Sequence, residues 1–226
     1  MSLQIRYANE SDSPELVRIN ALSFSPSVFY QNAFENVEFS ALCTLKYIRS
    51  FEKFVDPKYH VLVGTDSETG QTLASMRLII PLHLQQKSHS FIKLSEDAGR
   101  MVAEPEKYTP EGINQRVYAS FLNMLKAMRE KYLEKDDIVL DYLATDPEQQ
   151  GKGVGTQLLK WALQKADTLN ARMYLEASEV GYPLYQKHGW KLVEEIVLDF
   201  EPLGGSNKGR YYIMIRDPVA HPDQTS

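Results

Sequence analysis

The order of apolar and polar positions predicts a chain in which strands and helices are mixed. Apolar residues alternate with polar ones, or run without interruption, in segments typical of strands: 3–7, 59–65, 71–80, 138–144, 171–177, 191–199 and 210–215. Apolar residues recur at helical spacing after Asp12 or Ser13, and in about 35–54, 117–133, 154–169 and 183–187. This order predicts a mixed α/β (α+β) sheet with helices on its faces.

Turn and cap residues support two of these elements. Asp12 or Ser13 can accept the first backbone N–H groups of a helix, and Pro14 has the fixed φ angle that suits a first helical position. The run from Asp66 to Gly70 has turn composition and joins two strand-like segments, which predicts a hairpin.

Residues 82–112 form a polar stretch with little periodicity. A loop of about 30 residues inside a compact domain is usually functional or poorly ordered. We therefore predict one domain over residues 1–217, with an insertion at about 82–132, and a flexible tail over 218–226.

Composition narrows the class of protein. The chain has 226 residues, of which 43% are hydrophobic and 24% charged, as in an average globular protein. The formal charge of −5 disfavours a sequence-independent nucleic-acid binder, which needs a basic face. No apolar run approaches the ~18 residues of a membrane span, and the first residues lack the blocks of a secretion signal. We expect a cytoplasmic protein and leave a nuclear share open.

Cysteine and histidine chemistry is not favoured. Cys43 is the single cysteine, so an internal disulfide is excluded, and its apolar neighbours predict a core thiol and not a nucleophile. His83, His89 and His188 have no ligand-like spacing with other metal-binding side chains, so no metal site is expected.

A glycine-rich turn follows the strand at 138–144. It contains Gly151, Gly153 and Gly155 and leads into the helix at 154–169. Backbone N–H groups and the dipole at such a helix start can hold a phosphate. The turn lacks both the Lys-Ser/Thr pair of a nucleotide-triphosphate loop and the spacing of a dinucleotide fingerprint. Taken alone, it is equally compatible with a tight turn that binds nothing.

Two motifs together resemble the GNAT (Gcn5-related) N-acetyltransferases. Gln150-x-x-Gly153-x-Gly155 is similar to the family's acetyl-coenzyme A motif, and the segment Glu176 to Trp190 is similar to its later motif with Tyr185 and Gly189. The resemblance is close over 138–190, fair over 1–80 and weak over 82–132. It implies a mostly antiparallel sheet of about seven strands, splayed between the fourth and the fifth.

The resemblance implies a set of cofactor-binding residues. Backbone groups where the fourth strand bulges and splays would pair with the pantetheine arm of coenzyme A, and one N–H would polarise the thioester carbonyl. The glycine-rich turn would hold the pyrophosphate. The implied set is Leu143, Ala144, Thr145, Gln150, Gly151, Lys152, Gly153, Val154, Gly155, Thr156 and Ser178.

Catalytic roles are implied for three side chains, each with a structural alternative. Tyr185 is the candidate general acid for the leaving thiolate, or else an aromatic packing residue. Asp141 is the candidate general base, acting directly or through water, or else a buried and satisfied carboxylate. Glu176 competes with Asp141 for that role, or else faces solvent at a strand end.

The resulting hypothesis is an acetyl-CoA-dependent N-acetyltransferase acting by direct attack of an amine. The alternative is a catalytically silent coenzyme A-binding regulatory module. The partner would be a small-molecule or peptide amine, and we expect neither a nucleic-acid nor a membrane partner. The first two helices, the central insertion and the final hairpin would determine which amine is accepted. The acidity is a faint hint toward a cationic amine. Monomer and homodimer are both compatible with the sequence.

Overall fold

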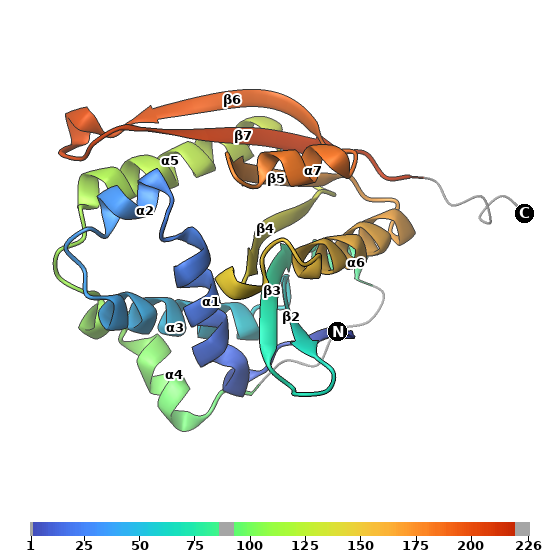
Figure 1. Ribbon diagram of the computed structural model, residues 1–226, viewed down its shortest axis with the longest axis horizontal. Coiled ribbons are helices and arrows are strands. Elements are labelled where there is room, and N and C mark those ends of the chain that lie inside the picture. The colour runs from blue at the N-terminus through green and yellow to red at the C-terminus, as the bar shows by residue number, and fades with distance from the viewer. Residues whose placement is uncertain (1, 86–92, 220–226) are drawn as a thin grey trace, which may run out of the picture.

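A single seven-stranded sheet organises the chain. The computed structural model describes residues 2–85 and 93–219. The strands lie in the order β1-β2-β3-β4-β5-β7-β6, and only the β4–β5 pair is parallel (Figure 1). Their bounds are β1 Leu3–Tyr7, β2 Tyr59–Asp66, β3 Thr72–Ile79, β4 Ile138–Thr145, β5 Met173–Ser178, β6 Lys191–Asp199 and β7 Lys208–Arg216. The predicted fold class is confirmed, and each predicted strand end lies within two residues of the observed one.

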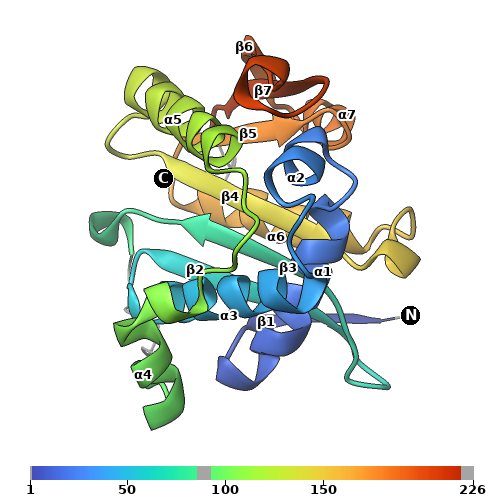
Figure 2. The same cartoon turned by 90° about the vertical axis from the view of Figure 1, so that its left-hand side faces the viewer.

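Helices cover both faces of this sheet. They are α1 Ser13–Phe24, α2 Val28–Ala33, α3 Phe39–Val55, α4 Glu96–Ala103, α5 Gln115–Tyr132, α6 Val154–Thr168 and α7 Tyr182–Lys187. Successive strand residues point to opposite faces. Leu62 of β2 packs in the core that contains the buried side of α6, whereas Val61 and Val63 pack with α1 and α3. Figure 2 shows α3 and α6 on opposite sides of the sheet.

The sheet opens between β4 and β5. These strands pair only at Ile138 with Met173 and at Val139 with Tyr174, and then part, as the resemblance implies (Figure 1). The β3–β4 register shifts, so that Arg77 faces Tyr142 and Leu78 faces Leu140. Asp141 is therefore the extra residue of a β-bulge, which bends a strand and re-aims its side chains. The bulge lies two residues before the predicted position at Leu143–Thr145.

Two helix predictions need correction at their boundaries. The second helix, expected at about 35–54, begins at Phe39, and the short helix α2 before it was not predicted. Six residues are too few for a periodic pattern, and α2 depends on its Ser27 cap and on packing against α5. At α1, Asp12 occupies the cap position without bonding to the helix, because its carboxylate pairs with Arg6 at 2.7 Å.

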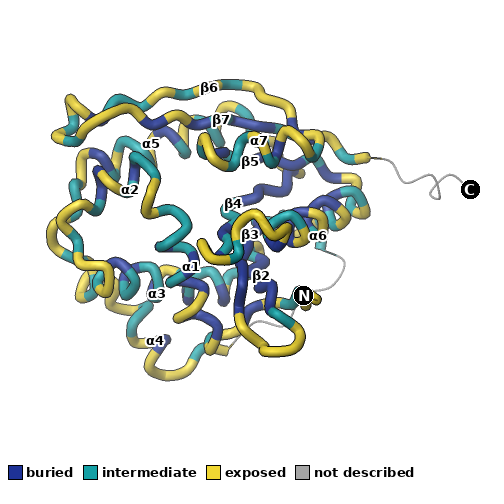
Figure 3. Tube along the Cα trace, in the orientation of Figure 1, coloured by how far each residue is buried: buried dark blue, intermediate teal, exposed yellow. Residues whose placement is uncertain are grey.

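The polar stretch at 82–112 is more structured than a loop. It contains α4, whose Ser95 cap accepts the N–H of Ala98 at 3.2 Å. Ala98 is buried in the core beneath α3, and Met101 and Val102 on the same face pack partly buried against that core, whereas the other residues of α4 are exposed (Figure 3). Ala98, Met101 and Val102 follow helical spacing behind a serine cap, so α4 carried a local signal that the sequence prediction missed. The predicted tail lies mostly outside the described residues.

Candidate functional site

One large cavity opens where β4 and β5 part. Its volume is about 1120 Å³, and its walls come from α1, α2, α3, α5, β2, β3, β4, the glycine-rich turn with the start of α6, β5, α7 and β7. These elements include the first helices, the final hairpin and the α5 part of the insertion, but none of the described residues within 82–112 lines the cavity. The site residues predicted from sequence that do line it are Asp141, Leu143, Thr145, Gln150, Gly151, Gly153, Val154, Gly155, Thr156, Glu176, Ser178 and Tyr185.

The glycine-rich turn presents unused backbone donors to this cavity. Gly151 and Gly153 have φ angles of 75° and 80°, a left-handed conformation that favours glycine. Space around both Cα atoms is open, since an added Cβ would meet nothing within 4 Å. Gly153 is the N-cap of α6, and no side chain caps this helix. The first N–H groups of α6 therefore have no partner within the helix, which is an arrangement suited to a phosphate.

The third glycine of the turn allows α6 to lie against β4. A Cβ at Gly155 would stand 2.8 Å from Oγ1 of Thr145, closer than real Cβ contacts come. The glycine thus fixes the distance between the helix start and the end of the splayed strand.

β4 has a free edge along its splayed part. The N–H of Asp146 donates to the Leu73 carbonyl of β3 at 2.8 Å, and backbone groups alternate along a strand. The backbone of Leu143 and Thr145 therefore faces the gap. The Thr145 carbonyl already accepts bonds from Ser23 Oγ at 2.7 Å and from Gln150 Nε2 at 3.2 Å. Leu143 is left as the residue whose backbone can pair with an extended ligand.

Two predicted cofactor residues do not line the cavity. Ala144 is buried, and by the same alternation its backbone faces β3. Lys152 is exposed, and its Nζ donates to Oε1 of Gln149 at 3.2 Å. Neither observation tests cofactor binding. Both indicate that a ligand in the cavity would contact the backbone of neighbouring residues and not these two side chains.

Both candidate bases are held in one ion-pair cluster. Asp141 lies 2.6 Å from Arg77 and 3.0 Å from Arg129, and Arg129 also binds Glu176 at 2.8 Å. Burial alone would raise the pKa of Asp141, but the charges and hydrogen bonds of Arg77 and Arg129 outweigh burial and hold the pKa below its usual value. Asp141 therefore stays ionised and is a weak proton acceptor near neutral pH.

Sequence reasoning missed both arginines of this cluster. Arg77 is the only charged residue in the apolar strand β3, which is the signal that could have identified it. Arg129 gave no such signal, because a basic residue near the end of an amphipathic helix is ordinary.

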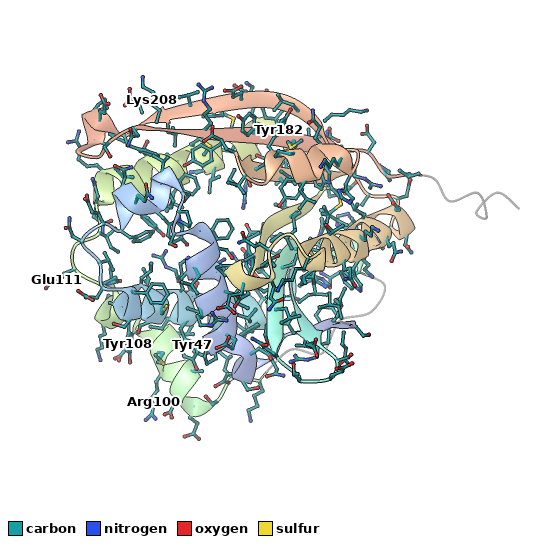
Figure 4. The ribbon with its side chains drawn as sticks, viewed as in Figure 1. Tyr47, Arg100, Tyr108, Glu111, Tyr182 and Lys208 are labelled. Atoms are coloured by element: carbon teal, nitrogen blue, oxygen red, sulfur yellow. The ribbon has the colours of Figure 1, made fainter. Side chains whose placement is uncertain are left out.

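Tyr185 lies buried in the cavity wall beside Trp190, with ring centroids 6.0 Å apart in an edge-on arrangement. Burial raises the pKa of its phenol, so the hydroxyl keeps its proton. This position is compatible with either of the two predicted roles of Tyr185, a general acid or an aromatic packing residue. The neighbouring Tyr182, labelled in Figure 4, stacks on Tyr212 at 4.3 Å and does not line the cavity.

Two further residues singled out from the sequence are Ser178 and Cys43. Ser178 lines the cavity and accepts the N–H of Gly181 at 3.3 Å, so it also shapes the turn into α7. Cys43 is half-buried on α3 and is not part of the cavity wall.

Residues 2–85 and 93–219 hold no group of three or more His, Cys, Asp or Glu that could bind a metal ion. Within the same residues, no helix is long and apolar enough to cross a membrane.

Comparison with known proteins identifies the fold. Residues 115–192 match the family model described as Acetyltransferase (GNAT) domain. No curated protein matches the chain. Among solved structures, one described as histone acetyltransferase HPA2 and related acetyltransferase from Corynebacterium glutamicum is similar with a TM-score of 0.60 and 17% identity, over 98% of this chain and 99% of that one.

Two further structures share this fold. A polyamine N-acetyltransferase from Drosophila melanogaster has a TM-score of 0.58 and 15% identity, over 96% of this chain and 100% of that one. PaiA N-acetyltransferase from Thermoplasma acidophilum, solved in complex with coenzyme A, has a TM-score of 0.53 and 15% identity, over 96% and 99%. The resemblance predicted from the motifs is therefore confirmed: the chain matches the GNAT acetyltransferase domain at 115–192 and has the GNAT fold throughout its seven-stranded sheet.

Proposed function

We propose that the chain is an N-acetyltransferase that transfers the acetyl group of acetyl-coenzyme A to an amine. One observation carries this proposal: the free edge of β4 and the uncapped start of α6 face the same cavity. An extended amide-containing arm and a pyrophosphate need these two features side by side. The fit is further supported by Gly155, whose missing Cβ lets the helix start approach Thr145.

The residues that would hold the cofactor follow from this geometry. Acetyl-coenzyme A supplies a thioester, whose carbon–sulfur bond breaks as the amine nitrogen forms a bond to the acetyl carbon. The N–H groups of Gly153, Val154 and Gly155 would bind the pyrophosphate, and the backbone of Leu143 would pair with the pantetheine arm. A backbone N–H of β4 aimed at the developing oxyanion would lower the activation free energy by about 3 kcal/mol.

Proton transfer would be divided between Tyr185 and water. Tyr185 keeps its proton and can donate it to the departing sulfur. Asp141 and Glu176 are engaged by Arg77 and Arg129, so direct removal of the amine proton by either carboxylate is disfavoured. We propose that the proton leaves through water oriented by this cluster.

The second candidate function is a silent coenzyme A-binding module. The same ion-pair cluster favours it, because both candidate bases at the gap, Asp141 and Glu176, are already engaged by an arginine. This module would bind coenzyme A through the turn before α6 and would acetylate nothing.

A panel of primary amines with acetyl-coenzyme A and purified protein tests both functions, with thiol release and product mass as readouts. We expect acetylated product from at least one amine. Binding of coenzyme A by calorimetry, together with no product from any amine, would replace the enzyme with the silent module. Absence of coenzyme A binding would contradict both.

A further inference from the structure

The cavity is basic although the chain is acidic. Among the residues that the structure describes, six basic side chains line it against three acidic ones, whereas the whole chain has a formal charge of −5. Each acidic side chain of the wall already has an arginine beside it: Asp141 and Glu176 lie in the cluster described above, and Glu179 lies 3.9 Å from Arg210. The surplus of positive charge therefore lies elsewhere in the wall, on α3.

Lys46 and Arg49 lie one turn apart on α3 and both line the cavity. Nζ of Lys46 donates to Oδ1 of Asn20 at 2.8 Å and lies 4.8 Å from the ring centre of Tyr30. Arg49 donates to the hydroxyl of Tyr118 and lies 5.4 Å from the centre of that ring. Within the described part of the chain, neither cation forms an ion pair with a carboxylate. Their partners are all neutral.

The positive charges of Lys46 and Arg49 lack a neutralising anion among the described residues. Burial in the aromatic wall, followed by the charges of Arg77 and Arg49, lowers the pKa of Lys46 to about 7. A desolvated cation beside two others, with a neutral amide as its hydrogen-bond acceptor, is less stable than the same cation beside an anion. An anion bound between Lys46 and Arg49 would relieve both the repulsion and the loss of hydration.

The phosphates of coenzyme A are poorly placed to supply that anion. The glycine-rich turn leads into α6, which packs on the face of the sheet opposite α3 (Figure 2). The cavity reaches both faces through the gap between β4 and β5. It therefore has an anion-binding feature at each end, one of backbone N–H groups and one of cationic side chains.

We propose that the acceptor is a primary amine that also carries an anionic group, a carboxylate or a phosphate, bound by Lys46 and Arg49. The inference rests on the proposed acetyltransferase function and names its substrate class. The amine would lie toward the gap, lose a proton to water and gain the acetyl group. Stacked Phe29 and Phe121, with ring centroids 3.9 Å apart, would pack against an apolar body. A polyamine would instead place a second ammonium among cations.

Phenylalanine and 2-phenylethylamine, which differ only by a carboxylate, test the acceptor. In wild type we expect kcat/KM for phenylalanine to exceed that for 2-phenylethylamine by roughly 10–100-fold, the effect of a charge-assisted hydrogen bond. Lys46→Met should remove this preference by raising the KM for phenylalanine alone, and Lys46→Arg should retain it. Lys160→Met, at an exposed lysine on α6, is the control. A preference for 2-phenylethylamine or putrescine would overturn the proposal.

Binding of unreactive anions tests the subsite without turnover. Calorimetry with 3-phenylpropionate and with phenyl phosphate should show binding that falls by roughly tenfold or more in Lys46→Met and Arg49→Met. The tighter of the two anions identifies carboxylate or phosphate. Coenzyme A affinity should not change in either variant. A loss of coenzyme A affinity with unaltered 3-phenylpropionate binding would assign the cations to the cofactor and overturn the proposal.

The two proposals fail in different ways. If no amine is acetylated but 3-phenylpropionate binding depends on Lys46, the anion subsite stands and the enzyme function does not. If amines are acetylated without regard to an anionic group, the enzyme function stands and the inference about the acceptor is wrong.

Discussion

Arg129 binds Glu176 with two hydrogen bonds, of 2.8 and 3.1 Å, and thereby ties α5 to β5 beside the opening of the sheet. The same guanidinium reaches Asp141 on β4 at 3.0 Å. One side chain thus connects the two strands where their backbone pairing has ended, and it sets the electrostatics of the cavity floor.

Removing this guanidinium should destabilise the fold. Arg129→Met leaves Glu176 unpaired and Asp141 with Arg77 alone, and breaking a buried ion pair costs about 3–5 kcal/mol. Urea denaturation measures the change in the free energy of unfolding. The control is Lys126→Met on the same helix, where the lysine is exposed and should cost less than about 0.5 kcal/mol. Equal effects of the two substitutions would contradict this role for Arg129.

Asp141 should make stability sensitive to acid. Its folded-state pKa lies below its unfolded value, which is near 4 for a free aspartate. Its contribution is therefore fully present above about pH 4 and is lost as the pH falls through the folded-state pKa. The free energy of unfolding should differ between wild type and Asp141→Asn at pH 7, and this difference should shrink by pH 3. A difference that is constant with pH would refute the prediction.

Tyr185→Phe should separate catalysis from binding. If the phenol donates a proton to the leaving sulfur, its removal lowers kcat by roughly 100-fold or more, whereas coenzyme A affinity changes little. Tyr182→Phe, in the same helix but outside the cavity wall, should leave kcat near the wild-type value. Steady-state kinetics and calorimetry give the two quantities. Unchanged turnover in Tyr185→Phe would leave Tyr185 as a packing residue.

Gly155→Ala should weaken cofactor binding. The new Cβ would come within 2.8 Å of Thr145 Oγ1 and push α6 away from β4, so the N–H groups would no longer lie beside the strand edge. We expect coenzyme A affinity to fall by roughly tenfold, about 1.4 kcal/mol. Gly99→Ala in α4, where a Cβ meets nothing within 4 Å, should leave affinity unchanged and raise stability by up to about 1 kcal/mol. Tight binding by Gly155→Ala would show that α6 can shift without loss.

The sequence was informative where one element determines its own conformation. The strands at 3–7 and 191–199 and the first residue of α6 agree with the structure, because alternation and the glycine-rich turn are local signals. The pairing of Asp12 with Arg6 was not predicted, because it depends on a contact that cap preference does not record. Helix α4 was missed although its Ser95 cap and the spacing of Ala98, Met101 and Val102 are local signals.

The candidate site also has a part that local sequence predicts and a part that it does not. Its backbone part, from Leu143 to Gly155, belongs to one continuous motif and was predictable from the resemblance. The charged side chains were not, because their partners are distant in sequence: Arg77 lies 64 residues from Asp141, and Lys46 lies 26 residues from Asn20. Only the folded chain brings these groups together.

The two residue pairs that join β4 to β5 have a consequence for the lifetime of the protein. A ligand lying along Leu143 would occupy the place of a missing strand and link β1–β4 to β5–β7. At a cofactor concentration 100 times its Kd, such binding raises the free energy of unfolding by about 2.7 kcal/mol. Hydrogen exchange in β5–β7 should then slow when coenzyme A is present. A cell with little acetyl-coenzyme A would hold the protein in its loosest form, the one most readily degraded by proteases.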